Sequence, residues 1–184
     1  MRRASPVAAV AALLVLATAS AVRADGTESG HDPWAPLRVF VGVWEGTGGG
    51  QPGTSRVSRE YRLTLGGRFL EVRNRAVYAP QEKNPKGETH EDIGYISWDR
   101  SRRRFVLRQF HVEGFVNQYV ADSLAAGADS VVFTSEAIEN IPPGWRARET
   151  LRILGPGAFV ERFELAAPGK DFELYSESRL RRRK

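Results

Sequence analysis

The histidines of this chain, at positions 31, 90 and 111, are the side chains best suited to acid–base or metal chemistry. No two of them share the i, i+2 or i, i+4 spacing of zinc ligands on one element, so the sequence predicts no metal site. His111 ends a run whose alternation places it on the same face as Phe105 and Leu107. An inward His111 near a cavity rim would suit ligand binding, general base catalysis or haem ligation. A lone histidine is more often an ordinary hydrogen-bonded residue, and both interpretations stay open.

A carboxylate and a guanidinium are also expected to face inward. Glu161 shares a strand face with Phe159 and Phe163. An inward carboxylate is costly unless it is paired. Arg59, beside Tyr61 on an otherwise apolar face, is the expected partner, or else an anchor for an acidic ligand. The alternative is that one or both side chains lie in water at the edge of the fold.

Other motifs point away from specific chemistries. Gly48 to Gly53 fits G-x-G-x-x-G, but Pro52 lies inside it and a strand-like run follows, so we expect a turn and no dinucleotide site. No G-x-S-x-G elbow is present. The acidic residues 88, 91 and 92 adjoin a charged stretch, Pro80 to Thr89, which we expect to be a solvated loop. The chain has no cysteine, which excludes thiol catalysis, cysteine-ligated metals and thiolate-ligated haem.

The elements that position these residues are predicted to be strands. Short runs rich in Val, Phe, Tyr and Leu alternate with turn signals at the spacing typical of all-β domains. We expect about ten strands, at 39–48, 57–65, 69–78, 93–98, 105–111, 115–124, 130–138, 147–154, 159–165 and 172–180. Short connections imply antiparallel neighbours. One apolar face per strand favours a single antiparallel up-and-down β-barrel, because closure removes exposed edges; a two-sheet sandwich is the alternative.

A barrel of ten strands is wide enough to enclose a cavity lined by alternate residues. Such a cavity suits a small, mostly apolar molecule, with a carboxylate on the ligand as one option. We expect Arg59, His111 or Glu161 to supply its polar contacts. The remaining residues predicted to line it are Trp44, Tyr61, Asn74, Tyr119, Phe163 and Tyr175.

The N-terminus predicts an exported protein. Residues 1–24 combine a basic start, an apolar run and small residues before Asp25, as a cleaved signal peptide does. The apolar run is too short for a membrane span, so no stable span is expected after cleavage, and the mature protein is predicted to be periplasmic or extracellular. Residues 25–36 are predicted to be a flexible lead-in whose end, from Pro33, forms a short helical turn that plugs the barrel. The barrel domain is predicted to span 37–180 and a solvated basic tail 181–184.

The basic charge comes from the two ends of the chain. The formal net charge is +5, and loss of three arginines with the predicted signal peptide lowers it to +2. Five of the remaining cations lie in the last six residues. Because no basic face is left on the domain, nucleic acid is not expected as a partner.

Three stretches carry a family resemblance. Gly42 to Gly50 resembles the G-x-W-x-G-x-G-x-G opening strand of nitrobindin-type haem-binding β-barrels and of related bacterial barrels of unknown function in the calycin (lipocalin and fatty-acid-binding-protein) class. The hairpin Leu65 to Leu70 and the stretch Gly94 to Asp99 are similar to the second group. The resemblance implies a ten-stranded barrel around a cavity. In nitrobindins a histidine on the last strand ligates the iron. Tyr175 holds that place here, so the resemblance implies ligation by Tyr175 if haem binds, and the inward His111 is the other candidate ligand.

Four functions are therefore open. The first is an exported barrel that binds a small apolar ligand, and the second is a haem or nitric-oxide protein. The third is a small-molecule isomerase or hydrolase that uses His111 or Glu161. The fourth is a barrel with a filled interior and a structural or interaction role.

Overall fold

The computed structural model describes residues 32–122 and 128–184. The predicted signal peptide, the lead-in as far as residue 31 and the last two residues of the strand predicted at 115–124 lie outside these ranges, as do residues 125–127. Within the described ranges, no helix has the length and apolar character needed to cross a membrane.

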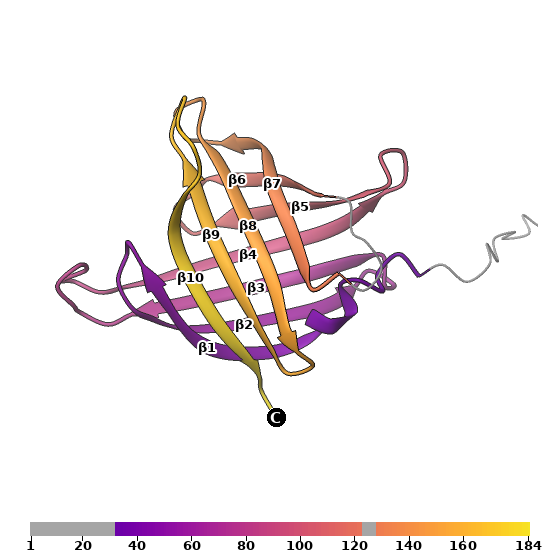
Figure 1. Cartoon of the computed structure of the whole chain (residues 1–184), viewed down its shortest axis with the longest axis horizontal. Coiled ribbons are helices and arrows are strands. Elements are labelled where there is room, and N and C mark those ends of the chain that lie inside the picture. The colour runs from indigo at the N-terminus through magenta and orange to yellow at the C-terminus, as the bar shows by residue number, and fades with distance from the viewer. Residues whose placement is uncertain (1–31, 123–127) are drawn as a thin grey trace, which may run out of the picture. The chain divides into compact units, whose positions relative to one another are not determined.

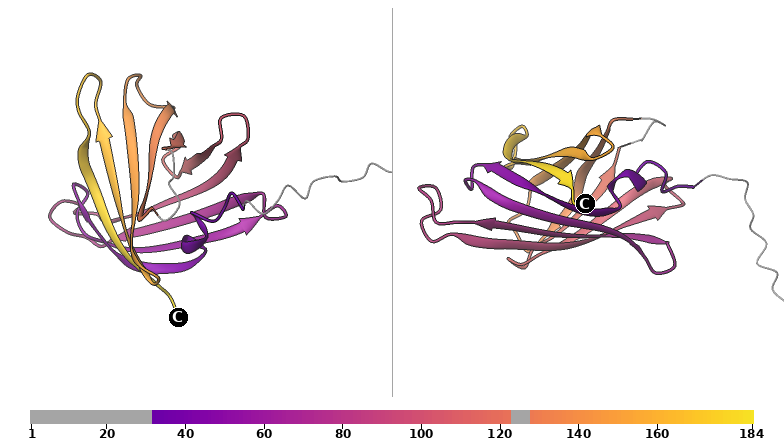
Figure 2. Two further views of the ribbon diagram at one scale, coloured as in Figure 1. Left: turned by 45° about the vertical axis from the view of Figure 1, so that its right-hand side comes forward. Right: turned by 90° about the horizontal axis from the view of Figure 1, so that it is seen from below.

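Ten strands follow a short 3-10 helix, η1, at Arg38–Phe40 (Figure 1). The strands are β1 Gly42–Gly50, β2 Ser55–Thr64, β3 Phe69–Tyr78, β4 Glu88–Asp99, β5 Arg104–His111, β6 Val116–Ala121, β7 Ser130–Glu139, β8 Arg146–Gly155, β9 Ala158–Ala166 and β10 Glu173–Arg182. Each strand pairs antiparallel with the next, and β10 pairs with β1 to close the barrel. The two views in Figure 2 follow the strands around it. The predicted all-β barrel is confirmed, and the sandwich alternative is excluded.

The fourth strand is the main correction to the predicted elements. β4 begins at Glu88, five residues before the predicted start at Ile93, and pairs with β3 from its first residue. Residues 88–92 therefore lie in a strand and not in a loop. Glu88, Thr89 and Glu91 are exposed, as expected, but Asp92 is 7% exposed because alternate residues of β4 face a polar barrel interior.

Aromatic side chains fill one end of the barrel. Trp34, Leu37 and Phe40 are buried in the turn and 3-10 helix before β1. The Phe40 ring meets Phe159 edge-on at 5.2 Å, and Trp44 donates a hydrogen bond from Nε1 to the Phe40 carbonyl at 2.6 Å. The predicted short helical turn is confirmed, but it lies at Arg38–Phe40, after the segment from Pro33 to which it was assigned. Residues 33–36, assigned to the flexible lead-in, form turns in which Trp34 is buried against the core.

The C-terminal strand reaches into the predicted basic tail. β10 continues to Arg182, which faces Trp44 in the ladder with β1. The Arg182 guanidinium stacks 4.3 Å over the Trp44 ring and donates hydrogen bonds to the carbonyls of Val39 and Val41. The prediction that the tail begins at Arg181 is therefore wrong by two residues, because these contacts hold Arg182 in the sheet.

Candidate functional site

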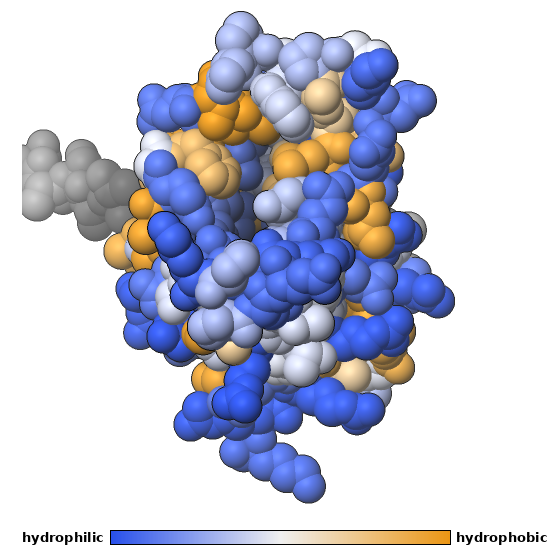
Figure 3. Space-filling model, turned by 90° about the vertical axis from the view of Figure 1, so that its left-hand side faces the viewer, coloured by the Kyte–Doolittle hydropathy of each residue, from blue (hydrophilic) through white to orange (hydrophobic). Residues whose placement is uncertain are grey.

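A cavity of about 550 Å³ opens at the end of the barrel away from the aromatic plug. Figure 3 shows the side of the molecule on which the surface is hollowed. Part of the wall is apolar and includes Val57, Ala76, Ile138, Trp145, Phe163 and Leu165. The polar base of the cavity is formed by Arg59, Asn74, Asp92, Gln109, His111, Asn117, Glu149 and Glu161. The exposed carboxylates of Glu88 and Glu113 also line the cavity. The cavity therefore combines an apolar wall with a hydrogen-bonding base.

A second hollow, of about 630 Å³, is a weaker candidate. Its lining includes the exposed side chains Arg73, Arg75 and Glu91. Water competes strongly for exposed charges, so contacts made there contribute little to affinity. We therefore place the candidate site in the barrel interior.

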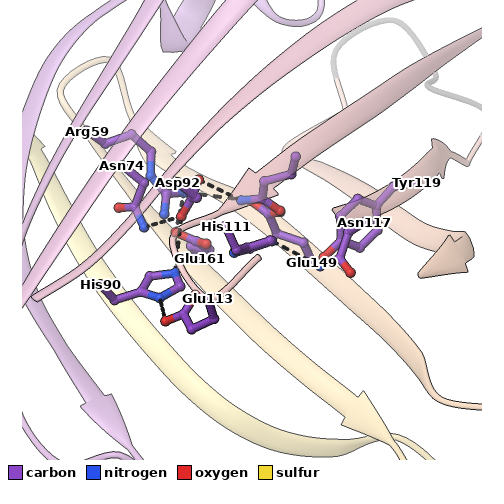
Figure 4. A network of polar contacts seen from close by, with 11 residues as sticks. Arg59, Asn74, His90, Asp92, His111, Glu113, Asn117, Tyr119, Glu149 and Glu161 are labelled. Carbon is purple, nitrogen blue, oxygen red and sulfur yellow. Dashed lines mark hydrogen bonds and ion pairs between the residues drawn. The ribbon is translucent and has the colours of Figure 1, made fainter. Parts of the chain in front are cut away.

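Strand register gathers the polar base of the cavity. Arg59 on β2 faces Asn74 on β3, Asn74 faces Asp92 on β4, and Asp92 faces His111 on β5. These residues form one cross-strand row on the inner face of the barrel (Figure 4). Directly facing residues on adjacent strands lie close enough for their side chains to interact. A row of this kind depends on the register of three hairpins at once.

An ion-pair cluster crosses the interior. Arg59 pairs with Glu161 of β9, and its Nη1 lies 3.6 Å from Oε1 of Glu149 on β8. The pairing of Arg59 with Glu161 predicted from the sequence is confirmed. Burial disfavours the Arg59 cation, but the neighbouring carboxylates outweigh this and raise its pKa well above the usual value.

Glu149 is the neutral member of this cluster at pH 7. Burial and the negative charge of Glu161 raise the pKa of Glu149 to about 8, against the opposing effect of Arg59. A protonated carboxyl group can donate a hydrogen bond as well as accept one. One charge pair, Arg59 with Glu161, is therefore left in the cluster at neutral pH.

A second charged pair lies beside the first. Asp92 accepts hydrogen bonds from Asn74 Nδ2 at 2.8 Å and Gln109 Nε2 at 2.9 Å, and its Oδ2 lies 3.4 Å from His90 Nε2. Burial alone would raise the pKa of Asp92, but its contacts with His90, Arg59 and the two amides lower it to about 2. The hydrogen bond to Asp92, opposed by burial and helped by Glu113, raises the pKa of His90 to about 9.

His111 lies next to this pair as a neutral imidazole. Its ring stacks on Phe115 with centroids 4.0 Å apart, and burial lowers its pKa to about 4. The Nε2 atom of His111 lies 3.2 Å from Nδ2 of Asn117, which also contacts the Tyr119 hydroxyl at 2.7 Å. Burial, against the opposing charge of Asp92, thus keeps His111 uncharged at neutral pH.

Buried atoms without a hydrogen bond concentrate in this cavity. Among the described residues, five buried side-chain atoms accept or donate no hydrogen bond within the protein: Arg59 Nε, Asn74 Oδ1, His111 Nδ1, Asn117 Oδ1 and Glu161 Oε2. Of these, Glu161 Oε2 is in contact with Arg59 through their ion pair. All five residues line the cavity. Because buried polar groups in folded proteins are nearly always hydrogen-bonded, these atoms are available to hydrogen-bond with a molecule that enters the cavity.

The structure brings together most of the residues predicted to line the cavity. Six of the nine lie in its wall: Arg59, Asn74, His111, Glu161, Phe163 and Tyr175. The other three, Trp44, Tyr61 and Tyr119, lie in the packed core with 2% or less of their surface exposed. Their faces were predicted correctly as inward, but they pack against other core side chains and do not reach the cavity.

Several residues of the polar base were not predicted as site residues. They are His90, Asp92, Gln109, Asn117 and Glu149. A local signal existed for the first two, because His90 and Asp92 are two residues apart and therefore share one strand face. Because residues 88–92 were predicted to be a solvated loop, the shared strand face of His90 and Asp92 was not predicted.

The described residues do not favour haem ligation by the two side chains predicted for it. Burial, with nearby Glu88 and Glu113, raises the pKa of Tyr175, which opposes the phenolate that ferric iron prefers. His111 lies among Asp92, Asn117 and a second histidine, His90, a polar surrounding ill-suited to the apolar face of a porphyrin. Haem binding therefore stays a prediction, and no function is derived through it.

Comparison with known proteins shows the fold. No protein-family model matches the chain, and no curated protein matches it. The chain is similar to the crystal structure of Rv2717c from M. tuberculosis, with a TM-score of 0.64 and 18% identity over 85% of this chain and 100% of that chain. A de novo designed fluorescence-activating β-barrel is more distant, with a TM-score of 0.42 and 16% identity over 83% of this chain and 100% of the design.

Proposed function

We propose that this protein binds a small molecule in the barrel cavity, with an apolar body against the apolar wall and an uncharged polar end at the base. The observation that carries the proposal is the group of buried polar atoms without hydrogen bonds, all in residues that line one cavity. A cavity of about 550 Å³ has the size of an ordinary small-molecule site. A barrel filled for structural purposes alone would be expected to pair those atoms internally.

Charge balance favours an uncharged polar end on the ligand. Arg59 is neutralised by Glu161, and Asp92 by His90. A ligand carboxylate would have to displace Glu161 from Arg59, so the acidic ligand considered from the sequence is the weaker option. The free amide oxygens of Asn74 and Asn117 accept hydrogen bonds, which favours a ligand that carries hydroxyl or amide N–H donors.

The direct test is binding of a fluorescent apolar probe to the purified full chain. Ala76 lies in the wall and is 6% exposed, so Ala76→Trp should fill part of the cavity and weaken probe binding at least about 10-fold. The matched control is Arg75→Trp, which adds the same ring to the exposed face of β3. Unchanged probe binding in a folded Ala76→Trp variant, or equal loss in both variants, would place the probe elsewhere and count against the proposal.

Identification of the natural ligand needs protein from its own host. Native mass spectrometry of that material should detect a co-purifying small molecule, and its absorbance spectrum tests haem directly. A Soret band that weakens in Tyr175→Phe or His111→Ala would favour the haem alternative over ours. The identified molecule would also test the isomerase or hydrolase alternative, in which His111 or Glu161 acts on a bound substrate.

Export is a separate part of the proposal, carried by the sequence of residues 1–24. Fractionation of host cells should place the protein outside the cytoplasm, with Asp25 as the first residue of the mature chain. Recovery of the uncleaved chain in the cytoplasm would overturn this part and leave ligand binding untouched.

A further inference from the structure

Two histidines and an aspartate meet at the wall of the cavity. One ring nitrogen of His90, one of His111 and one carboxylate oxygen of Asp92 lie within 4.8 Å of one another. His90 and Asp92 share the inner face of β4, and Asp92 faces His111 across the β4–β5 ladder. Residues far apart in sequence are thus brought together by one hairpin.

The spacing is close to that of a metal site. Metal bonds of about 2.0–2.1 Å in a tetrahedral zinc site place neighbouring ligand atoms about 3.3 Å apart. His90 Nε2 and Asp92 Oδ2 are 3.4 Å apart, so these two atoms already match. One ring nitrogen of His111 lies within 4.8 Å of a donor atom of each of the other two residues, so His111 must move closer for all three to bind one ion.

Outer contacts orient each of the three side chains. Glu113 Oε1 lies 2.7 Å from His90 Nδ1, which leaves Nε2 of the same ring directed at Asp92. Asn74 and Gln109 hold the Asp92 carboxylate through one oxygen each. A carboxylate on the far nitrogen of a ligating histidine and amides on a ligating carboxylate are the usual supports of protein metal sites.

An unpaired nitrogen supplies an independent sign of a ligand. His111 Nδ1 is buried and has no hydrogen-bond partner, whereas Nε2 of the same ring lies beside Asn117. The ring is stacked on Phe115. Because Asn117 Nδ2 donates to Nε2, the neutral ring carries its proton on Nδ1. Coordination of a cation through Nδ1 therefore requires this proton to move to Nε2 and the Asn117 amide to turn its oxygen toward it.

The donor set selects the class of ion. Two imidazoles and one carboxylate suit zinc and its first-row neighbours better than Mg²⁺ or Ca²⁺, which prefer oxygen ligands. Three protein ligands leave a fourth position for water or for a polar group of a bound molecule. The cavity lies at that position, because all three residues line its wall.

We propose that His90, Asp92 and His111 form a binding site for Zn²⁺ or a related first-row divalent ion, with one coordination position open to the barrel cavity. The alternative is an ion-pair cluster in which His90 bridges Asp92 and Glu113 and no metal binds. This proposal does not rest on the binding of an organic molecule, since the metal alone is its probe.

The test is titration of the chelator-treated full chain with Zn²⁺ by calorimetry and with Co²⁺ by visible absorbance. One equivalent of Zn²⁺ should bind, and Co²⁺ should give the intense visible bands of a tetrahedral site. His90→Gln and Asp92→Asn should each weaken Zn²⁺ binding by more than about 100-fold. Loss of a residue that only hydrogen-bonds to a ligand costs up to about 100-fold, and loss of a ligand itself should cost more. Glu113→Gln should weaken it by about 10-fold or more.

Glu91→Gln is the matched control, because Glu91 lies on the exposed face of β4 between the two ligands and should leave the affinity unchanged. Thermal unfolding shows whether each variant folds. If Asp92→Asn does not fold, His90→Gln and the Co²⁺ spectrum of the unaltered protein still decide the matter. Absence of Zn²⁺ binding, or binding that survives in folded His90→Gln, would overturn the proposal. Binding of the fluorescent probe, measured in parallel, tests the proposed function separately, and neither result determines the other.

Discussion

Arg59 of β2 and Glu161 of β9 form an ion pair across the interior of the barrel, between strands that are not neighbours in the sheet. Their side chains are 4% and 11% exposed. Removing two charges from water costs about as much as the attraction between them returns, so the pair adds little net stability. The ion pair instead fixes the positions of the two side chains, because either charge would be costly in the interior without the other.

Loss of one partner should therefore cost far more than loss of both. Arg59→Met leaves Glu161 as an uncompensated buried charge and should lower the free energy of unfolding by about 3–5 kcal/mol. The double variant Arg59→Met with Glu161→Gln should recover a large part of that loss. Urea unfolding of the two single variants and the double variant measures the coupling. A double variant that loses the sum of the single effects would show that the two residues act separately.

Glu149 should make the protein less stable as pH rises. Its folded pKa of about 8 lies above the ordinary value of 4.5, so between these values the folded state holds a proton that the unfolded state has released. Stability from this group is complete below pH 4.5 and is lost as pH rises toward 8, at no more than about 1.4 kcal/mol per pH unit. His111, with its lowered pKa, gains stability as pH rises from about 4 to 6.5, and His90, with its raised pKa, loses it above 6.5. The contribution of Glu149 is therefore measured as the difference between urea unfolding of the unaltered protein and of Glu149→Gln across this interval, and this difference should decline as pH rises.

Glu164 provides the control for that measurement. It lies on β9 and is bound by Arg148 through two hydrogen bonds of 2.8 and 2.9 Å, which lower its pKa against the effect of burial. Its contribution is therefore present above its ordinary pKa and lost at lower pH, the opposite sign to that of Glu149. The same difference measured with Glu164→Gln should show no decline between pH 4.5 and 8. An equal decline with both substitutions would contradict the assignment to Glu149.

The fold was predictable because strand patterns are local. Alternation along β3 and turn signals such as Gly66-Gly67 depend on neighbouring residues, and β3 was predicted with its observed ends. The pairing of Arg59 with Glu161 was also predictable, because an inward charge requires a partner and few were available.

The polar base of the cavity was less accessible to sequence reasoning. The row from Arg59 to His111 forms only when three hairpins have the right register, and a shift of one residue would turn every member outward. Glu149 carried no signal of its own, since exposed glutamates alternate with apolar residues in many strands. Charged residues at the start of β4 indicated a loop because they follow a stretch with two prolines, a glycine and further charges.

Gly46 should be required for closure of the barrel. A Cβ atom added there would collide with the backbone carbonyl of Arg179 on β10, the strand that closes the sheet with β1. Gly46→Ala should lower the free energy of unfolding by about 1–3 kcal/mol or more, because the two backbones must separate. At Gly49 on the same strand, an added Cβ atom meets nothing within 4 Å, so Gly49→Ala should change stability by no more than about 0.5 kcal/mol. Equal effects at the two positions, measured by urea unfolding, would show that close backbone approach is not the reason for the glycine.

Arg182 should hold the aromatic plug against the barrel. Its guanidinium stacks on Trp44 and donates hydrogen bonds of 2.6 and 2.7 Å to the carbonyls of Val41 and Val39, on either side of Phe40. Arg182→Ala should lower the free energy of unfolding by about 1–3 kcal/mol, because both kinds of contact are lost. Arg182→Lys should recover little of it, since an ammonium group lacks the planar fork that reaches two carbonyls while stacking on a ring. Arg181→Ala removes the same charge from an exposed neighbour and should change stability by less than about 0.5 kcal/mol. Thermal and urea unfolding measure the stability of both variants. If Arg181→Ala and Arg182→Ala are equally stable, the positive charge at the end of β10, and not the contact of Arg182 with the plug, determines the stability.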